Sequence, residues 1–395
     1  MPLPADRALR VTMVNKYYSP PHIGGVETVV RYLSEGLVAH TGAEVTAVVC
    51  NESRTRTDEN IAGVNVLRLP RQFALSSAPI ALGMPRALRR AVGSATPPDI
   101  IHLHQPYPWG DLAWLQARPD VPAVVSYHSD IVRQKRLLAA YKPFLERVLD
   151  RADLIVTSSP NMIANSPFLA PRAEKCRVVD YGLHVEEIAE PTAEVLARAE
   201  RIRAEHAGRR IVLFVGRLVY YKGVDVLVRA MASVDADVVL IGRGPLEGEL
   251  REIAVAAGIA DRVSFVAPLD DAGLSAYYRA ADVFALPSVA ASEAFGLVQI
   301  EAHAAGTPAV STDLPTSVPY ANLHDVTGLT VPVGDVSALS AALNRLVTDD
   351  ALRERLGKQA QERALSQFTI KHMVDGHLTA YAEAIERHAV KRGRL

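Results

Sequence analysis

The chain alternates short runs of apolar residues with longer stretches in which apolar residues recur every three or four positions. Short runs rich in β-branched residues are typical of strands buried on both faces of a parallel sheet, and stretches such as 25–40, GVETVVRYLSEGLVAH, are typical of helices that cover such a sheet. The pattern therefore predicts a doubly wound α/β arrangement. In the first half of the chain the predicted strands are 10–15, 43–50, 64–69, 99–104, 122–128 and 152–158.

The same alternation starts again near residue 210, with predicted strands at 209–216, 236–242, 261–267, 281–287 and 307–312. Two such sets predict two Rossmann-like parallel-sheet domains, which we place at 1–190 and 205–368, facing a central cleft at the carboxyl ends of their strands. The charged, alanine-rich stretch 184–210 is interpreted as a linker running into a short helix. Residues 369–395 are predicted to form a terminal helix that packs back on the N-terminal domain.

Composition narrows the class of protein. The 395 residues are 49% hydrophobic and 22% charged, which suits a globular protein with two cores. The 43 basic and 44 acidic residues balance, so nucleic acid is not an expected partner and any anionic ligand needs a local site. Cys50 and Cys176 are too few for a disulfide framework or a four-cysteine metal site. With no apolar signal core near the N-terminus and no membrane-spanning run, we expect a cytoplasmic protein.

Glycines follow two of the predicted strands. Gly24 and Gly25 end the loop after the first strand and open a helix, where glycines let backbone N–H groups approach an anion and the helix N-terminus adds a favourable partial charge. Gly242 stands in a similar turn of the second domain. The alternative in both places is that the glycines serve only the turn.

Two cations follow the opening strand of the second domain, in FVGRLVYYKGVD. Arg217 and Lys222 can both reach one site above the sheet edge, where two positive charges would neutralise a diphosphate and stabilise it as a leaving group. The alternative is a pair of solvated loop charges.

Two carboxylates lie eight residues apart in SEAFGLVQIE. Glu293 is predicted in the loop after strand 281–287, and Glu301 between one and two turns inside the helix that follows, so that both face one ligand. Carboxylates accept hydrogen bonds from neighbouring hydroxyls. A nucleotide sugar carries hydroxyls on both sides of a diphosphate. Two acids, two cations and close glycines are together the groups that bind such a substrate.

These residues resemble a known family. The segments GRLVYYKG, SEAFGLVQIEAHAAGTPAV and TGLTVPVGD are similar to the retaining glycosyltransferases of family 4, and PPHIGGVE and SYHSDIVRQKRLLAAYKPFLERVLDRADLIVTSSP extend the likeness over nearly the whole chain. The resemblance implies a GT-B fold and the E-x7-E signature at Glu293 and Glu301. It implies that Lys222 and Arg217 hold the donor diphosphate, that Glu293 contacts the transferred sugar and that Glu301 contacts the ribose. The residues assigned to donor binding are Gly24, Gly25, Arg217, Lys222, Gly242, Glu293, Phe295, Gly296, Leu297, Val298 and Glu301.

Histidines and aspartates are further candidates for catalysis and for metal binding. His128 ends strand 122–128 where the family has a histidine near the reacting sugar, so it joins Glu293, Arg217 and Lys222 as a catalytic residue that orients sugar and acceptor. We assign His102 and His104 to opposite faces of their strand, as poor joint metal ligands. Asp235-Ala236-Asp237 has a metal-binding spacing but precedes a strand, at the wrong end of the sheet. We expect no metal and no cofactor.

The resemblance also implies a reaction. In retaining enzymes without an evident nucleophile, the acceptor attacks on the face that the diphosphate leaves, and a leaving-group oxygen assists deprotonation. The likeness is strongest to mannosyl- and rhamnosyltransferases of surface polysaccharides, which favours GDP-mannose as donor and a glycan, glycolipid or polyprenyl-linked acceptor. Three alternatives stay open: a UDP-hexose transferase with a small-molecule acceptor, a nucleotide-sugar epimerase, and a non-catalytic binding relative.

One stretch suggests a membrane partner. Residues 133–151 combine an apolar face with six basic residues, a pattern that binds anionic membrane surfaces but is also found in any helix packed on a sheet. The sequence thus leaves peripheral contact with the inner face of the plasma membrane as an open expectation.

Overall fold

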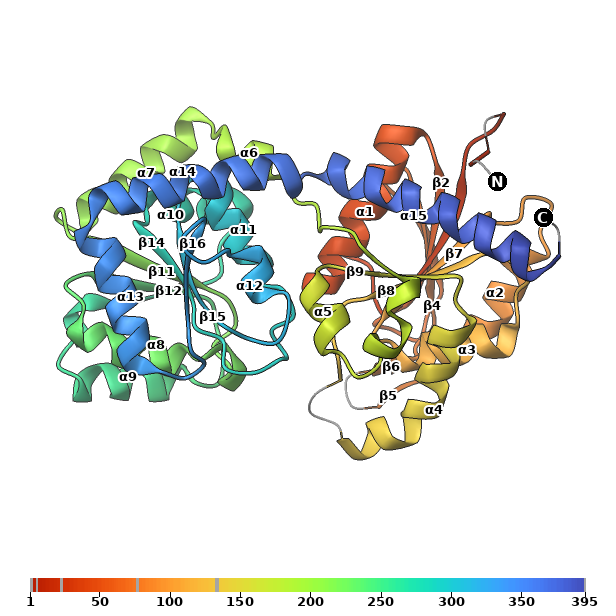
Figure 1. The fold of residues 1–395 in the computed structure, drawn as a ribbon, viewed down its shortest axis with the longest axis horizontal. Helices are drawn as coiled ribbons and strands as arrows, with labels where there is room; N and C mark the ends of the chain where they lie inside the picture. Colours follow the sequence, from red (N-terminus) through yellow and green to blue (C-terminus); the bar gives the residue numbers. More distant parts are fainter. Residues whose placement is uncertain (1–2, 5, 22–23, 76–77, 132–134, 394–395) are drawn as a thin grey trace. The chain divides into compact units, whose positions relative to one another are not determined.

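The computed structural model describes residues 3–4, 6–21, 24–75, 78–131 and 135–393, and the chain forms two compact units (Figure 1). Unit 1 comprises residues 1–183 and 370–395, and unit 2 comprises residues 184–369. Each unit contains a sheet of parallel strands flanked by helices, so the predicted α/β class is confirmed. Among the helices that the structure describes, none combines the length and the apolar character that crossing a bilayer takes.

The sheet of unit 1 has eight strands in the order β10-β9-β8-β7-β1-β2-β4-β3. From β1 the chain winds outward through β2 and β4, then returns to the other side of β1 and winds outward from β7 to β10. The strand order therefore reverses between β1 and β7. The strands are β1 (Arg10–Val14), β2 (Glu44–Cys50), β3 (Thr57–Ile61), β4 (Val64–Leu69), β7 (Ile100–Gln105), β8 (Ala123–Tyr127), β9 (Leu154–Thr157) and β10 (Cys176–Val178).

Within the described residues of unit 1, six helices accompany this sheet, including the C-terminal helix α15. Tyr381 of α15 lies 2.8 Å from His102 of β7 through its hydroxyl, and Arg177 and Glu383 form an ion pair at 2.6 Å. These contacts hold α15 on unit 1, although it follows unit 2 in the sequence. The helices are α1 (Gly25–Thr41), α2 (Met84–Val92), α3 (Pro108–Ala117), α4 (Lys135–Arg151), α5 (Pro160–Asn165) and α15 (Ile370–Lys391).

Some strands of unit 1 escape prediction because they lack a buried apolar run. Strand β3 pairs antiparallel with β4 at the edge of the sheet and reads TDENI, with four of its residues exposed. The three-residue strands β5 (Phe73–Leu75) and β6 (Ala78–Ile80) form a separate antiparallel pair, and β10 is equally short. Unit 1 thus has the predicted parallel sheet, with one antiparallel strand at its edge that the pattern does not predict.

The sheet of unit 2 has six parallel strands in the order β13-β12-β11-β14-β15-β16, so the winding direction reverses between β11 and β14. Strand β16, in TGLTVPVGD, was not predicted as a strand. The strands are β11 (Ile211–Val215), β12 (Asp237–Ile241), β13 (Val263–Val266), β14 (Val283–Leu286), β15 (Ala309–Thr312) and β16 (Gly328–Val331). The helices are α6 (Val185–Ala189), α7 (Ala193–Glu205), α8 (Val224–Ala230), α9 (Glu247–Ala256), α10 (Asp271–Ala280), α11 (Leu297–Ala304), α12 (Val318–Ala321), α13 (Val336–Thr348) and α14 (Asp350–Gln367).

Strand β11 shows why the central strands are continuous apolar runs. Val212 and Phe214 belong to one buried cluster, while Ile211, Leu213 and Val215 belong to another. Because consecutive side chains point to opposite faces of a sheet, both faces of β11 are buried under helices.

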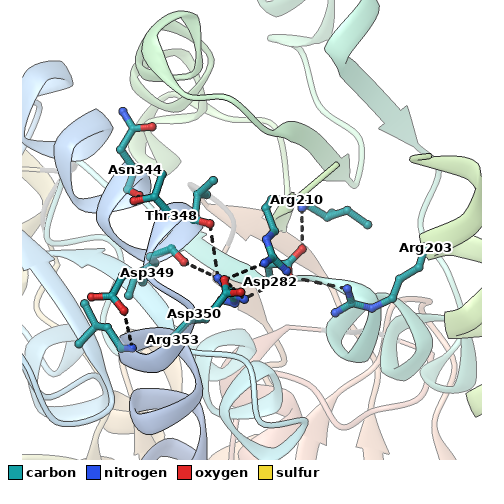
Figure 2. Close-up of polar contacts among 12 residues, drawn as sticks. Arg203, Arg210, Asp282, Asn344, Thr348, Asp349, Asp350 and Arg353 are labelled. Carbon is teal, nitrogen blue, oxygen red and sulfur yellow. Dashed lines mark hydrogen bonds and ion pairs between the residues drawn. The ribbon is translucent and has the colours of Figure 1, made fainter. Parts of the chain in front are cut away.

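The edge of this sheet at the amino ends of its strands is held by a cluster of charges around the buried Asp282 (Figure 2). Its carboxylate accepts hydrogen bonds from the backbone N–H of Ile211 at 2.9 Å and from Arg210 at 3.0 Å. Arg353 lies 3.8 Å away and also donates to Asp350 at 2.7 Å. One carboxylate thus ties β11 and the turn before β14 to the start of α14.

Candidate functional site

The candidate donor site of unit 2 is built on the carboxyl ends of β11 and β14, the two strands between which the winding reverses. In open α/β sheets this is where ligands bind. Gly216, directly after β11, and Gly242, directly after β12, approach so closely that a Cβ on Gly242 would lie 1.9 Å from the Gly216 carbonyl oxygen. Gly242 also has φ of +144°, so glycine is required there for the backbone alone.

Lys222 and Glu293 meet across this edge. Lys222 Nζ lies 2.5 Å from Glu293 Oε2, and both side chains are about nine-tenths buried. Ser288, two residues after β14, donates to the same carboxylate oxygen at 2.9 Å. The predicted proximity of a cation after β11 and an acid after β14 is therefore present, with the acid in direct contact with the cation.

Helix α11 starts at the same edge. Gly296 precedes it in the left-handed conformation, with φ of +75°, and a Cβ there would lie 2.4 Å from the side chain of Leu286. No described side chain caps this N-terminus. The first N–H groups of α11, including those of Leu297 and Val298, are thus left for a ligand anion. Phe295 is buried and anchors the segment, with its carbonyl accepting a hydrogen bond from Gln299 at 2.6 Å.

Glu301 lies in the second turn of α11, at the predicted depth. Its carboxylate accepts a hydrogen bond from the Tyr278 hydroxyl of α10 at 2.6 Å. Burial raises the pKa of Glu301, and the hydrogen bond from Tyr278 partly opposes that rise. Glu293 and Glu301 therefore have different partners, a lysine in one case and a phenol in the other.

Arg217 is exposed in the loop after β11, and its guanidinium lies 3.3 Å from the Tyr221 hydroxyl. It is in contact with neither Glu293 nor Glu301 by any hydrogen bond or ion pair that the described residues show. The structure thus brings Lys222 and Glu293 together, while Arg217 contacts Tyr221 in the exposed loop.

His128, Gly24 and Gly25 belong to unit 1. His128 is buried, and both of its ring nitrogens are engaged: Nδ1 lies 2.7 Å from the Tyr181 hydroxyl and Nε2 lies 3.1 Å from His104 Nδ1. Burial lowers its pKa to about 3, so the ring is neutral at pH 7. Both ring nitrogens of His128 are thus held by neighbours within unit 1, and its predicted role in orienting sugar and acceptor stays a prediction.

The glycine pair before α1 has a local reason of its own. A Cβ on Gly24 would lie 2.4 Å from the Glu27 carboxylate, and Glu27 is buried in the first turn of α1. The N-terminus of this helix therefore already has a carboxylate beside it. A ligand anion at Gly24 and Gly25 would have to share the helix N-terminus with Glu27.

The prediction that His102 and His104 lie on opposite faces of β7 is wrong. Their ring centroids are 4.2 Å apart. The physical reason is the two-residue period of a strand, which puts positions i and i+2 on the same face. Their contacts are with Tyr381, Ser126 and His128.

Asp235 and Asp237 lie at the amino end of β12, at the edge opposite the candidate site. Asp237 contacts His206 at 2.7 Å and Arg209 at 2.8 Å, and Asp235 contacts Arg209 at 2.8 Å. Over the described ranges, no group of three or more histidine, cysteine, aspartate or glutamate side chains is arranged to hold a metal ion.

Several residues of the site were not singled out from the sequence. Ser288 positions Glu293, Tyr278 contacts Glu301, and Gly223, with φ of +62°, approaches the Pro287 carbonyl. The sequence offers a signal for Ser288, because it lies two residues after β14, in ALPS. The sequence offers no signal for Tyr278, because its contact with Glu301 depends on how α10 packs beside α11.

Comparison with known proteins agrees with this geometry. Residues 198–363 match the family described as "Glycosyl transferases group 1", and residues 24–182 match the "Glycosyl transferase 4-like domain". The chain is 33% identical over 378 residues to the O-antigen chain mannosyltransferase C of Escherichia coli, covering 96% of this chain and 99% of the relative. It is also 33% identical over 361 residues to the D-rhamnosyltransferase WbpZ of Pseudomonas aeruginosa, covering 91% and 92% of the two chains.

Solved structures agree on the fold. The sucrose-phosphate synthase of Thermosynechococcus elongatus superposes with a TM-score of 0.76 at 25% identity, covering 94% of this chain and 98% of that one. Since the family models match both units and the relatives span nearly the whole length, the chain is a GT-B protein and belongs to glycosyltransferase family 4, in the branch of bacterial surface-polysaccharide enzymes that its motifs predicted.

Proposed function

We propose that the protein transfers a hexose, with retention of anomeric configuration, from a nucleotide-diphosphate sugar to a glycan, glycolipid or polyprenyl-linked acceptor in cell-surface polysaccharide or glycolipid biosynthesis. GDP-mannose is the favoured donor, because the relatives are named a mannosyltransferase and a rhamnosyltransferase. The observation that carries the proposal is the Lys222–Glu293 pair beside the uncapped N-terminus of α11, with Glu301 further along the same helix.

Each group suits one part of such a donor. Lys222, Arg217 and the first N–H groups of α11 supply the positive charge that a diphosphate requires. Glu301 supplies an acceptor for the ribose hydroxyls, and Glu293 one for the hydroxyls of the transferred sugar. His128, Gly24 and Gly25 belong to unit 1, to which we assign the acceptor and the orientation of the sugar.

The bonds of the proposed reaction balance without a further reagent. The bond between the anomeric carbon and the β-phosphate oxygen breaks, and an acceptor hydroxyl oxygen bonds to that carbon from the same face. The hydroxyl proton passes to the departing phosphate oxygen. Lys222, Arg217 and the α11 N-terminus stabilise the charge that develops on the nucleoside diphosphate, which is the form of catalysis expected where charge builds up in the transition state.

Metal independence is part of the proposal. Charge neutralisation at the site is assigned to Lys222 and Arg217, and Asp235 and Asp237 are engaged by basic side chains at the opposite edge. Turnover in EDTA tests this, and loss of activity that manganese restores would contradict it.

The proposal is tested by thermal stabilisation with GDP, UDP, ADP and TDP, followed by the corresponding hexose conjugates. GDP and GDP-mannose are expected to give the largest rise in melting temperature, because ligands that bind only the native state stabilise it. A larger rise with UDP would support the UDP-hexose alternative.

Product made from GDP-mannose should keep the α-configuration by NMR, and a β-product would contradict retention.

Contact with an anionic membrane is a second part of the proposal, and a groove in unit 1 supports it. The groove encloses about 1020 Å³ between α2, α3, α4 and the end of α15. Of the described residues that line it, none is acidic. Burial and the neighbouring arginines lower the pKa of Arg151, the effect expected where like charges crowd together. The lining includes five arginines, Arg89, Arg118, Arg147, Arg151 and Arg392, together with the exposed Phe144 and with Trp109.

Lipid phosphates would meet the arginines, and acyl chains would meet the aromatic rings. We expect vesicles with anionic lipid to retain the protein at low salt and to release it at high salt. Arg118→Glu with Arg147→Glu should abolish retention, while the matched pair Arg201→Glu with Arg229→Glu in unit 2 should not. Equal retention of all three proteins, or of none, would remove the membrane contact from the proposal. With that contact, we place the enzyme on the cytoplasmic face of the membrane.

A further inference from the structure

Two buried histidine nitrogens of unit 1 have no hydrogen-bond partner among the described residues, His104 Nε2 on β7 and His377 Nε2 on α15. The two side chains are 2% and 3% exposed. Both line one small cavity of about 10 Å³, whose wall also includes His128 and Tyr181. Buried polar atoms without partners are rare in folded proteins, so two of them around one cavity need an explanation.

The hydrogen on His377 can be placed from its contacts. His377 Nδ1 lies 2.8 Å from the backbone carbonyl oxygen of Met373, one turn earlier in α15. A carbonyl oxygen only accepts hydrogen bonds, so Nδ1 carries the hydrogen. Burial lowers the pKa of His377 to about 4, which leaves the ring neutral at pH 7. The other nitrogen, Nε2, therefore bears a lone pair.

His104 also lines this cavity, and it stands at the end of a short series of hydrogen bonds that starts at Tyr181. Tyr181 contacts His128 Nδ1 at 2.7 Å, and His128 Nε2 contacts His104 Nδ1 at 3.1 Å. Burial lowers the pKa of His104 and of His128, so both rings are neutral and each has one N–H. When the Tyr181 hydroxyl donates to His128, His128 Nε2–H donates to His104, and the N–H of His104 is left at Nε2.

With this direction of donation, the residues lining the cavity include one with an N–H at Nε2, His104, and one with a lone pair at Nε2, His377. A cavity of this volume is at the lower limit for one water molecule, and buried waters typically join polar groups that lack other partners. We propose that one water occupies this cavity, accepts from His104 Nε2 and donates to His377 Nε2, and that His104 and His377 are thereby positioning residues for His128. The functional part rests on the proposed role of His128 in transfer.

The consequence is that a residue of the C-terminal helix helps to set the tautomer of the strand-end histidine. With the water present, the chain runs from Tyr181 through His128 and His104 to His377 and the Met373 carbonyl, and every member has a partner. Without the water, either His104 Nε2–H is left without an acceptor, or all hydrogen bonds from Tyr181 to His104 run in the opposite direction. His102, although its ring is close to that of His104, bonds Tyr381 and Ser126 instead and lies outside this chain.

The water and the tautomers are tested first on the unmodified full chain, labelled with ¹⁵N-histidine. Long-range ¹H–¹⁵N correlation at pH 7 should show Nδ1–H on His377 and Nε2–H on His104 and His128, and a long-lived water should give a cross-peak to the His377 ring. A His377 ring protonated at Nε2, a His128 ring protonated at Nδ1, or a dry cavity would each overturn the proposal.

A pair of variants on α15 then tests the positioning role. His377→Leu keeps the volume but removes the lone pair, and Tyr381→Phe is the matched control one turn further along the helix. His377→Leu should shift the His104 and His128 nitrogen signals and lower kcat by about threefold to tenfold, as a small misplacement of a reacting group does, with the donor KM within about twofold. Tyr381→Phe should leave the His128 signals and kcat unchanged.

Failure of the positioning role can be distinguished from failure of the proposed function. Unchanged His128 signals and unchanged kcat in His377→Leu would overturn the positioning role. Equal effects of both variants would also overturn it, since they would report only a loosened α15. If the chain transfers no sugar to any acceptor tested, the proposed function fails, while the NMR experiment still decides the water and the tautomers. If His377→Leu fails to fold, the spectrum of the unmodified chain decides alone.

Discussion

At the scale of single residues, a substrate phosphate that binds Lys222 must compete with a carboxylate already in contact with it at 2.5 Å. Both groups are largely buried, so their attraction is weakly screened by solvent. Ser288 donates to the same oxygen of Glu293, and under the proposed function this bond would keep the carboxylate in place when Lys222 binds phosphate. Under the proposed function, the pair therefore divides into a group for the leaving diphosphate, Lys222, and a group held for the sugar, Glu293.

Variants of the two acids should differ in what they lose. Glu301→Ala should weaken binding of both nucleoside and nucleoside diphosphate by about 1–3 kcal/mol, because a charged hydrogen bond to ribose is lost. Glu293→Ala should leave nucleoside diphosphate binding equal or tighter, since Lys222 loses its competitor, while turnover falls strongly. Calorimetry and steady-state rates measure both, with Lys222→Ala as the variant that should weaken only the diphosphate. Equal losses of nucleotide affinity in the two glutamate variants would contradict this division.

The raised pKa of Glu301 gives nucleoside binding a pH dependence. A carboxylate accepts hydrogen bonds from hydroxyls in its charged form, and burial raises the pKa of Glu301 above the usual glutamate range. Affinity for guanosine should therefore fall as pH is lowered, beginning at a higher pH than an ordinary glutamate would give. Guanosine is used because its lack of phosphate removes the titration of the ligand itself. Glu301→Gln should flatten the profile, and a persisting slope in that variant would assign it to another group.

At the scale of elements, what the sequence predicts depends on how much burial an element has. The central strands β11, β12 and β14 are continuous apolar runs because both of their faces are covered, and the pattern finds them. Strand β3 is polar and exposed at the edge of its sheet, and no periodicity distinguishes it from a loop.

The same limit holds for the candidate site. Lys222 and Glu293 each follow a predicted strand in the sequence. Because parallel strands bring their carboxyl ends together, both residues are predicted at one edge of the sheet. Spacing does not show that the two groups form an ion pair or that Tyr278 contacts Glu301. Those contacts depend on rotamers and on how helices pack side by side. The family resemblance supplied the roles, and the structure supplied the partners.

The buried carboxylate of Asp282 gives a prediction for the amino-terminal edge of unit 2. Asp282→Asn should lower the free energy of unfolding of this unit by about 2–3 kcal/mol, because Arg210 and Arg353 lose a buried counter-charge, a cost moderated by their partial exposure. Chemical denaturation measures the loss. Asp235→Asn, at an exposed ion pair with Arg209, is the matched control and should be close to neutral.

Nucleotide affinity provides the second control for the Asp282 variant. The cluster lies at the strand edge opposite Lys222 and Glu293, so Asp282→Asn should bind nucleoside diphosphate as the unmodified chain does below its melting temperature. A loss of affinity as large as that of Glu301→Ala would show that the two edges are coupled, contrary to this expectation.

At the scale of the whole molecule, the two units differ in the buried groups whose pKa in the folded protein is shifted from the usual value. In unit 1, burial lowers the pKa of four histidines, among them His128 to about 3 and His377 to about 4, and raises the pKa of Asp111 to about 7. In unit 2, burial lowers the pKa of His303 to about 3 and raises that of Glu301. The histidines and the acids act on stability with opposite signs.

The sign follows from which state binds more protons. A histidine whose folded pKa is depressed binds its proton mainly in the unfolded chain, so its contribution to stability is present above about pH 6.5 and is lost as pH falls. An acid whose folded pKa is raised does the reverse. Four histidines against one aspartate leave unit 1 with a net uptake of about three protons on unfolding, while in unit 2 the shifts of His303 and Glu301 act in opposite directions.

Acidification should therefore unfold unit 1 before unit 2. Three protons correspond to a loss of about 4 kcal/mol per pH unit below about pH 6 in unit 1, whereas in unit 2 one histidine and one acid act against each other. Hydrogen exchange read peptide by peptide, corrected for its intrinsic pH dependence, measures the two units separately in one sample. His377→Leu removes one titrating group, so it should reduce the slope of unit 1 by about a third whatever it does to stability at pH 7. Loss of protection in both units at the same pH, or first in residues 184–369, would show that these buried histidines do not control the acid stability of the protein.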